Sequence, residues 1–142
     1  MDFAETMEAF RRDHSHGEFT LKAGEEAGIR ESVSEGYGCY VIWGIRGEKL
    51  EVLYVGKAGT LEHHGGWKKQ GLRKRLTMKQ GGVYRKDFFP KLIQKRQLDG
   101  LHFEWFETFG NGSRKPPFLA EAELLAAFFR EHGRLPPLNK TA

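Results

Sequence analysis

Two β-rich runs separated by a short glycine-containing segment constrain this chain more than any other feature of its sequence. The first runs from Tyr37 to Ile45 and the second from Leu50 to Val55, and both are rich in the aromatic and β-branched residues that favour strands. Between them, Arg46-Gly47-Glu48 can close a short hairpin, because glycine accepts the positive φ that such turns require. The sequence therefore predicts an antiparallel strand pair.

The predicted hairpin brings two tyrosines together. With Gly47 at the apex, Tyr40 and Tyr54 are equally far from the turn, and residues directly opposite each other in an antiparallel pair share a face. A register shifted by a whole pleat keeps them on that face. Cross-strand aromatic pairs most often serve packing alone. Here Gly38 and Gly56 also leave bare backbone beside each ring, which is typical of close approach by a ligand or another backbone.

The remaining pattern predicts an α/β fold with a small three-stranded antiparallel sheet flanked by helices. Residues 72–79 and 88–96 predict two short helices, 101–109 alternates like a strand, and 119–131 has the apolar spacing of an amphipathic helix. The expected order is β-β-α-α-β-α. Residues 1–36 hold one weak helical stretch and are interpreted as an acidic N-terminal extension, which leaves 37–142 as the domain.

Composition limits the class of protein. A chain of 142 residues has the usual size of one domain, and its lone cysteine, Cys39, excludes an internal disulfide. It contains no secretory signal pattern and no apolar run long enough to span a membrane. We therefore expect a soluble, cytoplasmic protein.

Charge is distributed unevenly along the chain. Residues 67–96 carry eleven basic side chains against Asp87 alone, whereas residues 1–36 have a net charge of −5. A basic block this concentrated is typical of a surface that binds a phosphate backbone. A solvated helical face gives the same pattern, so charge alone leaves the two interpretations equal.

Five short motifs, in order, resemble those of the GIY-YIG nuclease superfamily over residues 37–140, about three quarters of the chain. They are Gly38-Cys39-Tyr40, Tyr54-Val55-Gly56 followed by Lys57-Ala58, Leu72-Arg73-Lys74-Arg75-Leu76, Glu121 ahead of Leu124-Leu125, and Pro136-Pro137-Leu138-Asn139. The chain departs from the family pattern at four points. Cys39 replaces the usual Ile or Val, and the thirteen residues between Tyr40 and Tyr54 slightly exceed the usual gap. Residues 60–71 form an insertion, and Lys79 stands where many members have His or Tyr.

The resemblance implies a metal-dependent endonuclease that hydrolyses DNA phosphodiester bonds and uses Mg²⁺ or Mn²⁺. It implies Tyr40 as general base or activator of water, with Lys57 close enough to lower the pKa of that phenol. Tyr54 would orient the phosphate or the water, and Asn139 would hold the local network. A phenol with an ordinary pKa near 10 needs a neighbouring cation to act as a base at neutral pH.

The residue chemistry agrees with these roles. One carboxylate can anchor Mg²⁺ when water and phosphate oxygens complete its octahedron. Glu121 lies four positions before Leu125, along the buried edge of its predicted helix, whereas Glu123 falls on a more solvated face, so Glu121 is favoured as the metal ligand. Arg75 follows Leu72 by three positions, beside the core-facing stripe, and its planar fork suits a bidentate phosphate contact.

Several further residues are candidates for contact with nucleic acid. Those assigned to it are Gly56, Lys68, Lys69, Arg73, Lys74 and Lys79. Trp67 can either stack on a base or anchor its loop. The pairs His63-His64 and His14-x-His16 lack Cys or acidic partners and are interpreted as ordinary surface histidines.

Two other classes of function stay open. The first is a non-catalytic nucleic-acid-binding module that uses the basic segment 67–96. The second is a subunit or antibacterial toxin controlled by another protein. DNA is the expected partner, and a homodimer or a regulatory partner protein remains an alternative because no separate recognition element is evident.

Overall fold

The computed structural model describes residues 2–25, 32–68, 71–77, 79–80, 83–110 and 113–142. Its elements are α1 (Phe3–Asp13), β1 (Ser15–Lys22), β2 (Tyr37–Arg46), β3 (Lys49–Ala58), β4 (Thr60–Leu61), β5 (Trp67–Lys68), α2 (Leu72–Thr77), β6 (Lys79–Gln80), β7 (Val83–Tyr84), α3 (Arg85–Arg96), β8 (Gly100–Gly110), β9 (Ser113–Arg114) and α4 (Pro117–His132). Four long antiparallel strands form the main sheet in the order β1-β8-β2-β3, and the short β9 pairs with the end of β8. The protein is therefore an α/β protein with an antiparallel sheet packed against helices.

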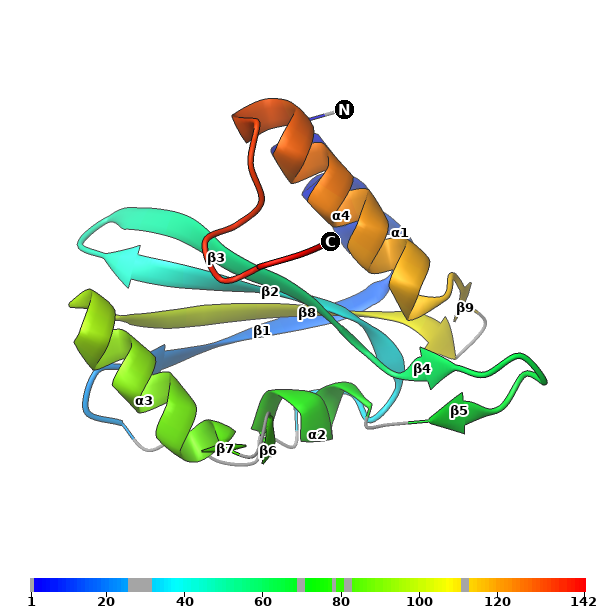
Figure 1. The fold of residues 1–142 in the computed structure, drawn as a ribbon, viewed down its shortest axis with the longest axis horizontal. Helices are drawn as coiled ribbons and strands as arrows, with labels where there is room; N and C mark the ends of the chain where they lie inside the picture. The colour runs from blue at the N-terminus through cyan, green and yellow to red at the C-terminus, as the bar shows by residue number, and fades with distance from the viewer. Residues whose placement is uncertain (1, 26–31, 69–70, 78, 81–82, 111–112) are drawn as a thin grey trace.

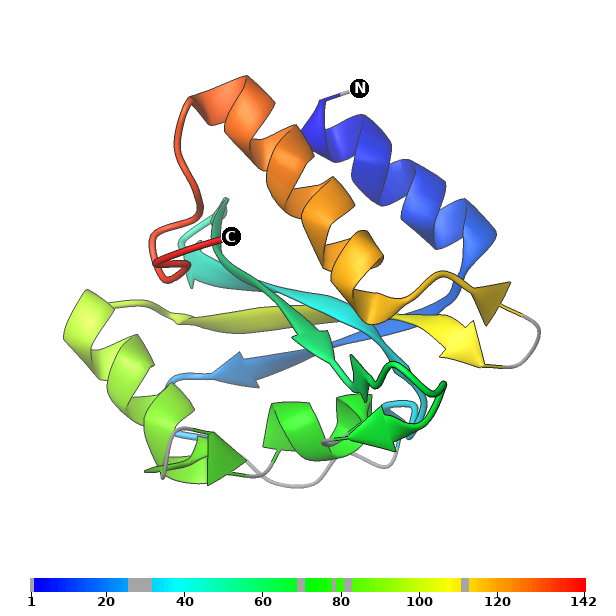
Figure 2. The same ribbon diagram turned by 45° about the vertical axis from the view of Figure 1, so that its right-hand side comes forward.

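Helices cover both faces of this sheet (Figures 1 and 2). Helices α1 and α4 lie side by side on one face, and α2 and α3 lie on the other. The α1/α4 core consists of Phe3, Met7, Phe10, Cys39, Val41, Val52, Val55, Phe106, Ala120, Leu124, Leu125, Ala127 and Phe128. The α2/α3 core consists of Leu21, Val33, Tyr40, Ile42, Leu53, Ala58, Leu72, Leu76, Phe89, Leu92, Ile93, Leu98, Leu101, Phe103 and Trp105.

The N-terminal segment contributes a helix and a strand to this arrangement. Asp2 caps α1 by accepting a hydrogen bond from the Glu5 amide, and Phe3, Met7 and Phe10 bury one face of that helix. Strand β1 then pairs with β8 along its whole length. The expected three-stranded sheet is therefore corrected to four long strands. Most residues of β1 are exposed or half-buried. Its sequence therefore lacks the clear alternation of apolar and polar residues that predicts a strand.

The hairpin between β2 and β3 departs twice from the expected register. Arg46 pairs with Lys49, so the turn is one residue shorter than expected, with Gly47 at φ +62°. A β-bulge then lies beside Ile42, where Leu53 is the extra residue of β3. Each departure shifts the pairing by one residue, which alone would exchange the two faces of the strand. Together they restore the original faces.

The two tyrosines consequently share a face, as predicted. Tyr40 pairs with Gly56 and Tyr54 pairs with Ile42, and both rings pack in the α2/α3 core. Direct opposition of the rings is wrong, because the shorter turn and the bulge make the tyrosines diagonal neighbours. Their ring centroids lie 6.0 Å apart with planes inclined by 40°.

The other predicted elements are present with shifted ends. The helix expected over 72–79 ends at Thr77, and the one expected over 88–96 begins at Arg85. The final helix extends from Pro117 to His132 and ends at Gly133, whose φ of +69° is left-handed. The insertion at 60–71 contains the two-residue strands β4 and β5. No helix among the described residues is long and apolar enough to cross a membrane.

Candidate active site around Gly56 and Glu121

The two candidate tyrosines meet over Gly56. Tyr40 is fully buried and Tyr54 half-buried. A Cβ at Gly56 would lie 2.6 Å from the Tyr40 hydroxyl oxygen and 2.6 Å from the Tyr54 ring, which no side chain tolerates. A Cβ at Gly38 would meet the Phe106 carbonyl of β8. Both glycines are thus required by close approach within the protein itself, and Gly56 holds the space in which the tyrosines converge.

Glu121 lies in the first half of α4 and is half-buried. Burial raises the pKa of the Glu121 carboxyl, and the positive charges of Lys57 and Arg75 act in the opposite direction. Within the described part of the chain, no side chain forms a hydrogen bond or ion pair with Glu121. Glu123, by contrast, forms an ion pair with Lys115 at 2.7 Å. The carboxylate left open to a ligand is therefore Glu121.

Arg75 belongs to α2, which lies on the other face of the sheet from Glu121. Its charge acts on Glu121, yet its Nε is buried and finds no hydrogen-bond partner among the described residues. A buried donor without a partner costs roughly 1–3 kcal/mol, and such atoms are rare in folded proteins. An oxygen atom of a bound ligand would satisfy it.

Lys57 lies on the face of Glu121 rather than on that of Tyr40. It pairs with Cys39 across the hairpin, and Cys39 belongs to the α1/α4 core. Successive side chains of a strand point to opposite faces, so the backbone of Lys57 directs its side chain away from the α2/α3 core that contains Tyr40. The register therefore associates Lys57 with Glu121, in agreement with the effect of its charge on the pKa of that carboxyl.

Asn139 holds the outer edge of β3 from the C-terminal tail. Its Oδ1 accepts a hydrogen bond from the Val55 amide at 2.9 Å, and its Nδ2 donates to the Val55 carbonyl at 2.8 Å. The Leu138 amide also donates to the Leu53 carbonyl. Val55 stands between Tyr54 and Gly56, so Asn139 fixes the backbone that carries both.

The candidate nucleic-acid contacts divide into three groups. Arg73 is occupied inside the protein, because its guanidinium donates to the Val33 carbonyl and pairs with Glu35 at 2.8 Å. Lys74 is exposed on α2. Lys69, together with the side chains of Lys68 and Lys79, lies outside the described residues. The basic segment 67–96 is therefore not one continuous free surface, since Arg73 docks residues 33–36 onto α2.

The aromatic and histidine alternatives have structural explanations. Trp67 stacks on Tyr37 with ring centroids 4.2 Å apart and contacts Phe109 at 4.8 Å, which anchors β5 to the sheet. His63 and His64 contact each other edge to face. In the described ranges, no group of three or more His, Cys, Asp or Glu side chains could hold a metal ion. A metal at this site would depend on Glu121, and an open half-buried carboxylate fits a divalent ion whose other ligands are water and phosphate oxygens.

Two hollows were not expected from the motifs. An apolar groove of about 570 Å³ begins beside Glu121 and is lined by Phe118, Ala122, Leu125, Ala126, Phe129, Leu135 and Ala142. The spacing of Phe118, Ala122, Leu125 and Phe129 forms a second apolar stripe on α4, and that signal was present in the sequence. The other hollow, of about 560 Å³, combines residues from four segments that are far apart in the sequence (3–11, 43–52, 96–98 and 128–134), so no local pattern predicts it.

Comparison with models of protein families, with curated proteins and with solved structures finds no match to this chain.

Proposed function

We propose that this chain is a metal-dependent endonuclease that hydrolyses DNA phosphodiester bonds through a GIY-YIG type fold and active site. The observation that carries the proposal is the open pairing of Glu121 and Arg75. Glu121 is half-buried and has no hydrogen-bond or ion-pair partner among the described residues, the charge of Arg75 acts on it, and the buried Nε of Arg75 also has no partner there. An anion-binding donor and a metal-binding acceptor are thus both available, and the charge of the first acts on the second.

Each residue has a role that its surroundings support. Arg75 donates to a non-bridging phosphate oxygen, which satisfies its buried Nε and stabilises the charge that develops on the phosphorus centre. Glu121 holds Mg²⁺ or Mn²⁺, and a bound divalent ion supplies Lewis-acid polarisation of the phosphate. Lys57 favours the ionised form of Glu121 and adds positive charge beside the phosphate.

The tyrosines and Asn139 complete the site from β2 and β3. Tyr40 activates the attacking water and Tyr54 orients the phosphate, with both rings held over Gly56. The register of Lys57 favours action on Glu121 over action on Tyr40. Asn139 positions these groups through the backbone of Val55.

The decisive experiment is a cleavage screen over duplex, single-stranded and branched DNA and over RNA, with and without Mg²⁺ or Mn²⁺. Glu121→Gln should reduce metal-dependent cleavage by about 100-fold or more, the usual loss when a key transition-state contact is removed. Glu123→Gln is the matched control, because it removes a carboxylate of the same helix that is already paired with Lys115, and it should retain most activity.

Two outcomes would overturn the proposal. Full activity of Glu121→Gln, with the fold verified by circular dichroism, would remove the assigned site. Salt-dependent DNA binding without cleavage under any metal condition, unchanged in Glu121→Gln, would favour the non-catalytic binding module. The occupation of Arg73 by Glu35 and Val33 reduces the free positive surface on which that alternative depends.

A further inference from the structure

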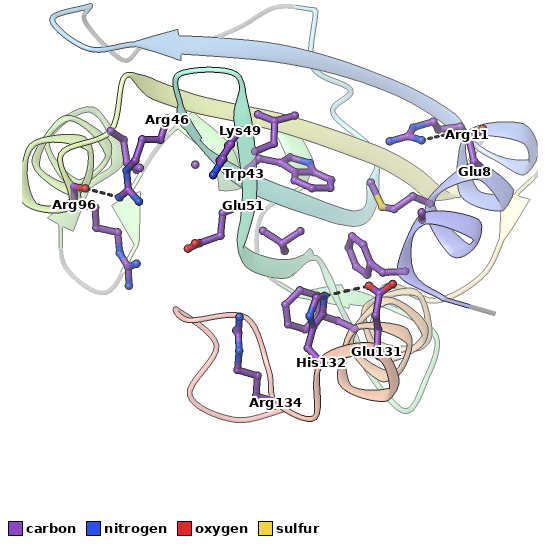
Figure 3. A pocket seen from close by; sticks show the side chains of 18 residues that line it. Glu8, Arg11, Trp43, Arg46, Lys49, Glu51, Arg96, Glu131, His132 and Arg134 are labelled. Atoms are coloured by element: carbon purple, nitrogen blue, oxygen red, sulfur yellow. Dashed lines mark hydrogen bonds and ion pairs between the residues drawn. The ribbon is translucent and has the colours of Figure 1, made fainter.

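A hollow of about 560 Å³ lies between α1, the β2–β3 turn and the last turn of α4 (Figure 3). None of the residues assigned to the proposed active site lines it. His132, on its wall, is eleven positions beyond Glu121 on α4, which is about 16 Å along the helix axis. The hollow therefore requires an explanation of its own.

The floor of the hollow is aromatic. Phe3 meets Trp43 edge to face with ring centroids 6.0 Å apart, and it meets Phe128 at 5.6 Å. The indole Nε1 of Trp43 is buried and has no hydrogen-bond partner among the described residues. Buried indole N–H groups normally find an acceptor, so a ligand acceptor that reaches Nε1 after a small shift of the covering side chains would supply the missing bond.

The rim near the β2–β3 turn is basic. Arg46 and Lys49 come from the hairpin, Arg96 from the end of α3 and Arg134 from the C-terminal tail, and Figure 3 shows them gathered on one side of Trp43 around the single carboxylate Glu51. Among the described residues, Arg11 forms ion pairs with Glu8 and Glu104, and Glu131 contacts His132, whose ring is charged only when protonated. Arg46, Lys49, Arg96 and Arg134 set against Glu51 and Glu131 leave a surplus of two positive charges when histidine is counted as neutral.

We propose that this hollow binds a nucleoside phosphate, with the base on the aromatic floor and the phosphate at the basic rim. A surplus of two positive charges fits a phosphate better than the single charge of a carboxylate. Flat rings suit stacking on aromatic side chains, and the Trp43 N–H offers a donor to a ring nitrogen or sugar oxygen. The volume lies within the range of about 300–1,000 Å³ that is usual for small-molecule sites. This inference is independent of the proposed nuclease activity.

The test uses the full chain labelled with ¹⁵N and titrated with adenosine 5′-monophosphate. The chain has three tryptophans, and Trp43→Phe identifies the indole N–H signal of Trp43. The nucleotide should move that signal saturably and leave the Trp105 signal, from the opposite face, unchanged. Lys49→Ala combined with Arg134→Ala should weaken binding about ten-fold or more. Lys91→Ala, which removes an exposed cation outside the hollow, should bind normally.

Parallel titrations with adenosine, inorganic phosphate and octanoate distinguish the sources of binding. Weaker shifts with each of these than with the nucleotide support the proposal. The inference is overturned by the absence of a Trp43 shift, by equal binding of octanoate or inorganic phosphate, or by equal weakening in Lys91→Ala. Glu121→Gln should bind the nucleotide normally. Loss of binding in that variant would locate the nucleotide in the proposed active site and overturn the inference while leaving the nuclease proposal intact.

Discussion

Two arginine–carboxylate arrangements flank the same sheet, and they differ in whether the pair is closed. Arg11 on α1 contacts Glu104 on β8 through Nε at 2.5 Å and Nη2 at 2.9 Å, and Glu104 is almost fully buried. The pKa of Arg11 is raised, chiefly by its hydrogen bond to Glu104. The charge of Arg75 acts to lower the pKa of Glu121, but the described structure contains no hydrogen bond between the two side chains.

The closed pair stabilises the fold, whereas the open pair keeps hydrogen-bonding capacity for a ligand. Arg11 and Glu104 neutralise each other and join α1 to the sheet. At the open pair, burial raises the pKa of Glu121, and the Nε of Arg75 has no partner among the described residues. Each group therefore makes an unfavourable contribution to the folding free energy of the ligand-free protein. Groups held in a costly state are typical of functional sites. The comparison predicts opposite consequences of mutation at the two pairs.

The largest effect is expected from Arg75→Ala, on activity rather than stability. Loss of a guanidinium that stabilises developing phosphate charge should lower the rate of metal-dependent cleavage by about 100- to 1,000-fold. The unfolding midpoint in urea should not fall, because the buried Nε makes no hydrogen bond to the described residues that could be lost. Arg12→Ala, which removes an exposed arginine of α1, is the control. Equal cleavage by the two variants would contradict a role for Arg75.

The residues of the open pair, Arg75 and Glu121, could be selected from the sequence, whereas the closed Arg11–Glu104 pair could not. Helical spacing alone puts Arg75 beside the core-facing stripe of its helix and prefers Glu121 to Glu123. The Arg11–Glu104 contact joins residues 93 positions apart, and it depends on β1 pairing with β8. Strand β1 has a mostly exposed, irregular pattern, so the sequence gives no signal for that pairing or for the contact.

For the β2–β3 hairpin, the prediction that Tyr40 and Tyr54 share a face is confirmed, although the turn length and register on which it was based are wrong. The expected turn was one residue too long and the bulge at Leu53 was not expected, yet each changes the register by one residue and their effects cancel. Tyr40 and Tyr54 share a face because two register shifts of one residue each return every side chain to its original face of the sheet. The rings are displaced along the strands because of the shorter turn and the bulge, and no local sequence pattern predicts that bulge. The association of Lys57 with Glu121 likewise could not be predicted from its position next to Gly56.

The closed pair should give the largest stability effect. Arg11→Ala leaves the buried Glu104 carboxylate without its counter-charge, and we expect a loss of about 2–4 kcal/mol in the free energy of unfolding, measured by urea denaturation. Arg12→Ala should change it by about 0.5 kcal/mol or less, because Arg12 pairs with Asp13 on the exposed surface at 3.3 Å. Similar losses in the two variants would show that the Arg11–Glu104 pair contributes no more than a surface contact.

Asn139→Ala should have an intermediate effect, confined to the edge of β3 beside the open pair. It removes two hydrogen bonds to Val55, and we expect a loss of about 1–2 kcal/mol in unfolding free energy. Hydrogen exchange at the Val55 amide should accelerate markedly. Asn139→Asp keeps the acceptor for the Val55 amide but loses the donor to the Val55 carbonyl. The exchange rate of the Val55 amide in this variant should therefore lie between the rates in the native chain and in Asn139→Ala. Unchanged exchange in Asn139→Ala would contradict the assigned positioning role.

The smallest expected effect is a gain of stability in Glu121→Gln. Because burial raises the pKa of Glu121 above its ordinary value of 4.5, the folded protein disfavours the ionised carboxyl relative to the unfolded chain. Well below pH 4.5 both states are protonated and no penalty exists. As pH rises, the unfolded chain ionises first, and stability falls until the folded-state pKa is passed. At neutral pH the glutamine variant should therefore melt about 1–3 °C higher than the native chain, and the difference should vanish in acid.

Glu123→Gln, which breaks the ion pair with Lys115, should show no such gain in melting temperature. A lower melting temperature for Glu121→Gln at neutral pH would mean that Lys57 and Arg75 need this carboxylate for folding, and the distinction between a closed structural pair and an open functional one would then disappear.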